Sequence, residues 1–102
     1  MFGLLKRDIK YITKALKQFD NIEKAIIFGS RAMGNYKSGS DVDIAIVGKN
    51  INRHILSQIS DLLNEEYPLP YFFDVINYNE INNPELKKHI DIFGIDLSPS
   101  TR

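Results

Sequence analysis

The sequence predicts a mixed α+β fold, in which helices pack against a small mixed β-sheet. Two observations support this prediction. Short apolar runs of strand length alternate with longer segments in which apolar residues recur every three or four positions. The resulting order is helix, strand, strand, helix, strand, helix, which suits an α+β or mixed α/β sheet. With 102 residues the chain has the usual size of one domain, so we expect a single domain over residues 1–102.

Three amphipathic helices are predicted, because apolar residues recur at helical spacing and each stretch ends at residues that break helices. The first covers about residues 4–19. The second covers about residues 51–66, where two prolines follow. The third has proline at its first helical position, after Asn83, and we expect Gly94 to close it.

The strands are predicted from short apolar runs bounded by turn-forming residues. Residues 29–40 are rich in Gly, Ser and Asn, which indicates a loop with room for one short helical turn after Ser30. The predicted strands cover residues 22–28, 41–47 and 71–78, with a candidate short edge strand at 95–97 and a frayed tail at 98–102.

Composition limits the kinds of partner and compartment. Thirteen basic and thirteen acidic residues leave no formal net charge, which argues against bulk binding to nucleic acid. No cysteine is present, which fits a reducing cytoplasm. The apolar stretch at the N-terminus is too short for a signal peptide, and no run approaches the length of a membrane span. We therefore expect a cytoplasmic protein without membrane contact.

The segment from Gly29 to Asp43 carries the residues best suited to chemistry. One apolar run ends on Gly29-Ser30, and the next opens with Asp41 and Asp43. Residues two apart in a strand point to the same face, so the two carboxylates should project together and attract a hard cation such as Mg²⁺. Glycine lets backbone N–H groups approach an anion closely, and Ser30 adds a hydroxyl donor. This combination favours phosphoryl or nucleotidyl transfer.

Asp74 lies in the most hydrophobic segment of the chain, where an unpaired charge is unfavourable. Two interpretations are open. Asp74 either caps a turn or meets a cation at a strand edge, or it is a third metal ligand on a neighbouring strand. The presence of Asp41 and Asp43 favours the metal ligand.

Competing motifs fail on spacing. Gly29 and Gly34 match the beginning of a P-loop, but Asn35-Tyr36 stand where lysine and serine or threonine are needed. A calcium loop beginning at Asp41 would lack its central glycine and its final glutamate.

Two further groups of residues have less specific signals. We expect His54 and His89 to be solvated, because both have polar neighbours in the sequence. Tyr67, Leu69 and Tyr71 surround two prolines, and this segment either docks a partner or packs on the core.

The motifs together resemble the DNA polymerase β-like nucleotidyltransferase superfamily. Those motifs are Gly29-Ser30, the run from Ser40 to Asp43, and Asp74 on a later strand. Residues 29–34 and 69–75 look typical of the minimal nucleotidyltransferase branch, which contains the MntA-like antitoxins. One departure is Met33, which stands where many relatives carry a basic residue.

The resemblance implies the palm fold of these enzymes and transfer of AMP from ATP to a hydroxyl, typically that of a tyrosine. Two Mg²⁺ ions would assist, with Asp74 binding the catalytic ion and helping to deprotonate the acceptor. Gly29, Ser30 and Arg31 would hold the triphosphate. The implied catalytic and metal-binding residues are Asp41, Asp43 and Asp74.

The resemblance also implies a partner that supplies the acceptor. That partner would be a HEPN-type or substrate-binding four-helix-bundle protein from an adjacent gene, and the pair would form a toxin–antitoxin system. Two alternatives remain open. One is a non-catalytic nucleotide-binding module that neutralises its partner by occlusion, and the other is a small-molecule nucleotidyltransferase.

Overall fold

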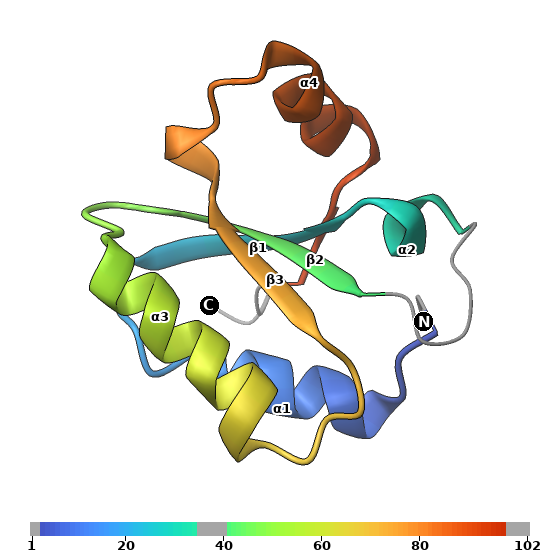
Figure 1. Ribbon diagram of the computed structural model, residues 1–102, viewed down its shortest axis with the longest axis vertical. Coiled ribbons are helices and arrows are strands. Elements are labelled where there is room, and N and C mark those ends of the chain that lie inside the picture. The colour runs from blue at the N-terminus through green and yellow to red at the C-terminus, as the bar shows by residue number, and fades with distance from the viewer. Residues whose placement is uncertain (1–2, 35–40, 98–102) are drawn as a thin grey trace.

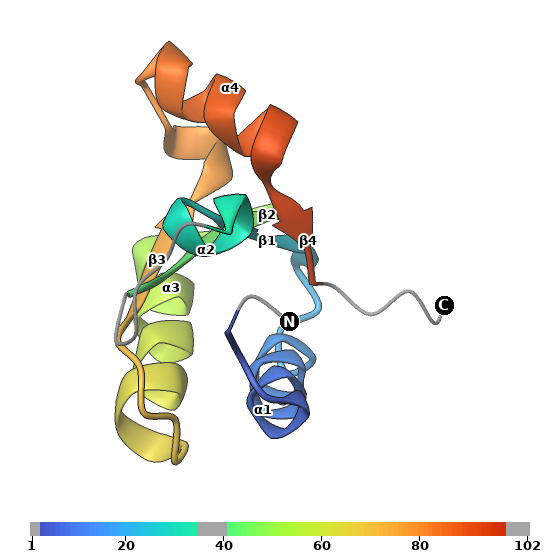
Figure 2. The same ribbon diagram turned by 90° about the vertical axis from the view of Figure 1, so that its right-hand side faces the viewer.

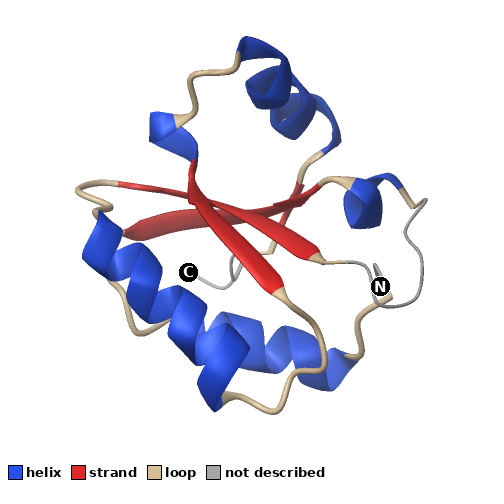
Figure 3. Cartoon of the chain, viewed as in Figure 1, coloured by secondary structure: helices blue, strands red, loops and turns tan. Residues whose placement is uncertain are grey.

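A mixed β-sheet runs through the middle of the molecule and has helices on both of its faces (Figure 1, Figure 3). The computed structural model describes residues 3–34 and 41–97, so residues 35–40 of the predicted loop and the predicted tail lie outside the described residues. The predicted α+β class with a small mixed sheet is confirmed. None of the helices within the described ranges is long and apolar enough to cross a membrane.

The described strands are ordered β3-β2-β1-β4 in the sheet. β1 pairs antiparallel with β2 and with β4, whereas β2 and β3 are parallel. The candidate edge strand near residue 95 is therefore present as β4. The strand bounds are Ile22–Phe28 for β1, Val42–Gly48 for β2, Phe73–Asn77 for β3 and Ile95–Asp96 for β4.

The predicted helices are all present, and the short helical turn after Ser30 is present as α2. The helices are α1 (Lys6–Leu16), α2 (Ser30–Met33), α3 (Arg53–Asp61), which continues as the π-helical turn η1 (Leu62–Glu66), the 3₁₀ turn η2 (Tyr78–Glu80) and α4 (Pro84–Phe93). α1 and α3 are shorter than the ranges predicted for them, whereas the third predicted helix begins at proline and ends before Gly94 as expected.

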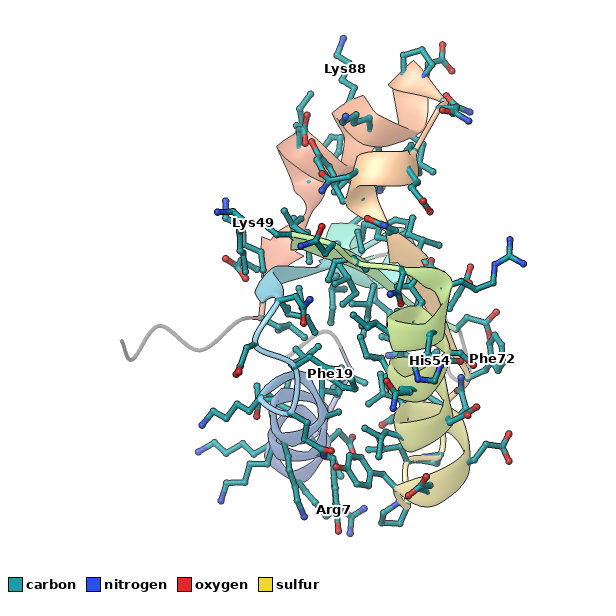
Figure 4. All side chains as sticks on the ribbon, turned by 90° about the vertical axis from the view of Figure 1, so that its left-hand side faces the viewer. Arg7, Phe19, Lys49, His54, Phe72 and Lys88 are labelled. Carbon is teal, nitrogen blue, oxygen red and sulfur yellow. The ribbon has the colours of Figure 1, made fainter. Side chains whose placement is uncertain are left out.

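The two faces of the sheet carry cores of different size. α1 and α3 cover one face and enclose the main core, and α4 covers the other face (Figure 2). Figure 4 shows Phe19 facing the main core, whereas Arg7, Lys49 and Phe72 lie at the periphery. The smaller core under α4 contains the buried residues Phe28, Ala45 and Ile90. Because α4 packs on this second face through a small core, part of the face remains accessible.

Gly94 ends α4 for a different reason than the sequence suggested. Its φ is −64°, so it does not adopt the left-handed conformation that usually selects glycine after a helix. A β-carbon at this position would instead overlap the side chain of Ile26 and the carbonyl of Ile90. Glycine is needed here because α4 returns so closely onto β1.

The beginning of β3 is held by a side chain from η1. The Oδ1 atom of Asn64 accepts the N–H of Phe73 at 2.7 Å, and its Nδ2 atom donates to the carbonyl of Phe73 at 3.0 Å. Among the strands that the structure describes, β3 lies at the edge of the sheet, so these backbone groups face no further described strand. Tyr71 and Phe72, predicted as strand, precede β3. Asn64 thereby fixes the strand that carries Asp74.

Replacing Asn64 by leucine should lower the free energy of unfolding by about 1–3 kcal/mol, because both backbone groups of the buried Phe73 would lose a partner. Chemical denaturation measures this change. The control is Glu65→Leu, which places the same residue at the next, exposed position and should change stability by less than about 0.5 kcal/mol. Equal effects of the two substitutions would contradict the role of Asn64.

Candidate active site

Asp43 and Asp74 lie side by side on neighbouring strands. They are register partners in the parallel pair of β2 and β3. The flanking residues Val42, Ile44 and Phe73 belong to the main core, so by strand alternation both carboxylates project from the opposite face, which α4 partly covers. The sequence alone gave the spacing of each aspartate within its strand, and the register shows that the two strands bring them together.

Asp41 immediately precedes β2 instead of opening it, because the ladder begins at Val42, whose N–H donates to the carbonyl of Phe72 at 2.9 Å. Asp41 and Asp74 are exposed, and Asp43 is half-buried. The pKa of the Asp43 carboxyl is raised, first by burial and then by the negative charges of Asp74 and Asp41. Asp43 therefore lies close enough to each of the other two carboxylates to be repelled by it.

This donor set suits a hard divalent cation, because it consists of carboxylate oxygens whose mutual repulsion a cation would relieve. Within residues 3–34 and 41–97, no three His, Cys, Asp or Glu side chains are close enough together to hold one ion as they stand. Asp41 and Asp74 are exposed side chains with freedom to rotate. Only Asp43 is partly fixed by its surroundings.

Gly29 lies directly against the Asp43 carboxylate. Its φ of +79° and ψ of −153° fall in a region that only glycine occupies readily. A β-carbon added to Gly29 would lie 2.5 Å from Oδ2 of Asp43. Both the backbone conformation and the neighbouring carboxylate thus require glycine. Ser30 follows as the half-buried first residue of α2.

His89 is half-buried, contrary to the sequence-based expectation that it is solvated. Its Nε2 atom accepts the backbone N–H of Gly29 at 3.0 Å, and its ring packs against Phe28 and Phe93. Sequence reasoning missed this contact because 60 positions separate the two residues. The available signal was local: His89 and Phe93 lie one turn apart on the same helix face. His54 is exposed, as predicted.

Arg31 lies inside the molecule. Only 3% of its surface is exposed, and its guanidinium carbon is 5.0 Å from the centre of the Tyr71 ring. The Tyr71 hydroxyl donates to Oδ2 of the buried Asp8 at 3.0 Å. Burial and the Asp8 carboxylate raise the pKa of Tyr71. Arg31 therefore links α2 to α1 through its contact with Tyr71. The predicted contact of Arg31 with a phosphate stays a prediction.

The segment between η1 and β3 packs against α1. The centre of the Tyr67 ring lies 5.0 Å from that of Tyr11, and the ammonium of Lys14 lies over the Tyr67 ring. The Tyr67 hydroxyl accepts a hydrogen bond from Nε2 of Gln18 at 3.1 Å. Tyr67, Leu69 and Tyr71 are half-buried beside the main core. Of the two interpretations offered by the sequence, packing on the core describes these three side chains.

Comparison with known proteins adds a family and a fold. The family model described as "Polymerase beta, Nucleotidyltransferase" matches residues 10–98. Among curated proteins, no sequence matches the chain.

Solved structures match the fold over most of its length. One is a toxin–antitoxin crystal structure with AMP-PNP, at a TM-score of 0.74 and 19% identity, covering 91% of this chain and 74% of that one. Another is the MntA-HpeT toxin–antitoxin with two aspartates changed to glutamate, at a TM-score of 0.72 and 16% identity with the same coverage of 91% and 74%. A presumed nucleotidyltransferase from Sulfolobus solfataricus gives a TM-score of 0.52 and 23% identity, covering 88% of this chain and 78% of that one.

Replacing Asp43 by asparagine should stabilise the metal-free protein at pH 7 by up to about 1 kcal/mol, after allowance for solvent screening of a half-exposed group. The pKa of Asp43 is higher in the folded than in the unfolded chain, so ionising it destabilises the fold. Wild-type stability therefore falls as pH rises through these two pKa values, and the advantage of the variant vanishes below both.

Thermal unfolding in a metal chelator, at pH 7 and near pH 3, measures this difference. Glu23→Gln is the control, because it removes a carboxylate from an exposed position of β1. A variant at Asp43 that is no more stable than this control at pH 7 would show that the carboxylates do not repel one another in the folded chain.

Proposed function

Because the chain belongs to the polymerase β nucleotidyltransferase family, we propose that it transfers AMP from ATP to a hydroxyl group of a partner protein. The observation that carries this proposal is the register of the sheet, which aligns Asp43 with Asp74 on one open face. Asp41 lies two positions before Asp43, and the Gly29-Ser30 turn adjoins the same carboxylate. A phosphate-binding turn beside three carboxylates is what nucleotidyl transfer requires.

We assign Asp41, Asp43 and Asp74 as the ligands of two Mg²⁺ ions. When bound, the ions would neutralise the triphosphate and stabilise charge on the attacking and leaving oxygens. Asp41 and Asp43 would hold both ions and Asp74 one of them, and Asp43 is the least exposed of the three carboxylates. The metal count rests on the family resemblance.

The remaining residues would bind and orient the nucleotide. Ser30 offers a hydroxyl donor at the start of α2, and Gly29 lets the backbone approach without steric hindrance. Arg31, the next residue of α2, would contribute the positive charge of its guanidinium. Positioning and charge neutralisation supply most of the acceleration in such reactions, since no covalent enzyme intermediate is needed.

In the proposed reaction the acceptor oxygen attacks the α-phosphorus of ATP. A new P–O bond forms as the bond to the bridging oxygen breaks, and pyrophosphate leaves. Asp74 would receive the hydroxyl proton, because it is exposed on the open face and lies beside the metal-binding strand. The products are the adenylylated acceptor and pyrophosphate.

The proposed acceptor is a tyrosine of a toxin whose activity the modification suppresses. Two of the solved structures with this fold are toxin–antitoxin complexes, and one of them holds AMP-PNP. In the other, two aspartates spaced as Asp41 and Asp43 are here were replaced by glutamate. A four-helix-bundle protein of HEPN or substrate-binding type, encoded by an adjacent gene, is the partner we would test first.

Asp43→Asn should lower the rate of transfer at least about a thousandfold while leaving the fold intact, because the charge that holds the metal–triphosphate would be lost. The assay combines labelled ATP, Mg²⁺ and the product of the neighbouring reading frame, with mass spectrometry of that product. Glu23→Gln is the matched control and should retain wild-type activity.

Two further measurements on the same variant distinguish modification of the partner from occlusion. Partner binding by the Asp43→Asn variant is measured alongside transfer and should persist. If the variant still protects cells from the partner as well as wild type does, neutralisation occurs by occlusion and the transfer hypothesis is wrong.

A further inference from the structure

His89 connects α4 to the turn at the centre of the proposed site. Its Nε2 atom lies 3.0 Å from the backbone nitrogen of Gly29 and accepts its N–H. The ring is half-buried, with its centre 6.3 Å from that of Phe28 in an edge-on contact and 5.4 Å from that of Phe93. Two aromatic neighbours thus fix the orientation of the imidazole while its nitrogen faces the turn.

The direction of this hydrogen bond fixes the chemistry of the ring. An imidazole nitrogen accepts only through its lone pair, so in the neutral ring the proton resides on Nδ1. Gly29 is itself half-buried. Without His89, its N–H would lose its partner in a place that water reaches only in part, which is unfavourable by an amount comparable to one hydrogen bond.

Gly29 is held from two sides by groups that are distant in sequence. Asp43 packs on its α-carbon and His89 accepts its N–H. The backbone between them adopts a conformation, φ +79° and ψ −153°, that is unfavourable for other residues and persists only where its surroundings fix it. A small movement of this turn would displace Ser30 relative to the Asp43 carboxylate.

We propose that His89 is a positioning residue for nucleotide binding, which holds the Gly29-Ser30 turn in the conformation that receives the triphosphate. The inference rests on the proposed function for its effect on ATP. Its effect on the turn is independent of that function. His89 does not touch the reacting atoms, and it acts through Gly29.

Two complementary substitutions separate the hydrogen bond from the ring contacts. His89→Gln places an acceptor oxygen at the same number of bonds from the backbone but removes the ring. His89→Phe keeps a ring against Phe28 and Phe93 but has no acceptor. If the hydrogen bond matters, glutamine preserves the behaviour of the wild type and phenylalanine does not.

The first measurement is amide hydrogen exchange of Gly29 by NMR in the nucleotide-free protein. His89→Phe should accelerate this exchange about tenfold, the change expected for loss of one hydrogen bond of ordinary strength, and His89→Gln should change it far less. The amide of Ile44, in the middle of β2, is the internal reference and should exchange alike in all three proteins. Equal acceleration at Ile44 would mean general destabilisation and would overturn the assignment.

The second measurement is the affinity for ATP with Mg²⁺, together with KM and kcat for transfer. His89→Phe should raise KM about tenfold with a smaller change in kcat, because the turn binds substrate and transition state alike, and His89→Gln should restore KM. If glutamine is as defective as phenylalanine, or if neither changes Gly29 exchange, His89 is not a positioning residue. A wild type that does not bind ATP overturns the proposed function, while Gly29 exchange still reports whether His89 holds the turn.

Discussion

β2 and β3 are parallel, and two parallel strands cannot be joined by a hairpin. After the end of β2 the chain must therefore run back along one face of the sheet before β3 begins beside the start of β2. The connection between β2 and β3 contains α3 and η1, and these helices supply much of the main core. The same crossover sets the register in which Asp43 faces Asp74. A shift of one residue would turn Asp74 toward the core and Phe73 toward solvent, which burial of Phe73 opposes. Hydrophobic packing on one face therefore fixes the carboxylates on the other.

The negative charges of Asp41 and Asp74 beside Asp43 do not stabilise the fold. Burial and two neighbouring carboxylates disfavour ionisation of Asp43. The backbone of Gly29 also lies directly against its carboxylate. Such a grouping is easier to explain by a cation or a charged ligand than by stability. Stability comes chiefly from the main core, and the side chain of Asn64 adds two hydrogen bonds at the outer edge of β3.

The face that carries the carboxylates is only thinly covered. α4 packs on it through a small core, Gly94 lies close against Ile26 of β1, and His89 binds the backbone of Gly29 just after β1. On the opposite side of the site, Arg31 and Tyr71 join α2 to α1 through the buried Asp8. The turn at Gly29 lies between these two attachments. A site of this kind can stay open to a large acceptor while its binding turn remains ordered.

The sequence by itself determined the class of fold, the main helices and strands, and the residues with the chemistry of a metal and phosphate site. These features are local: apolar spacing sets each element, and Asp41 and Asp43 lie two positions apart at the start of one apolar run. Only the tertiary structure decided what distant segments do to one another. It paired Asp74 with Asp43, buried Arg31 on Tyr71, and brought His89 to Gly29. Spacing along the chain carries no information about such contacts, because they depend on how the sheet is ordered and how closely the helices return to it.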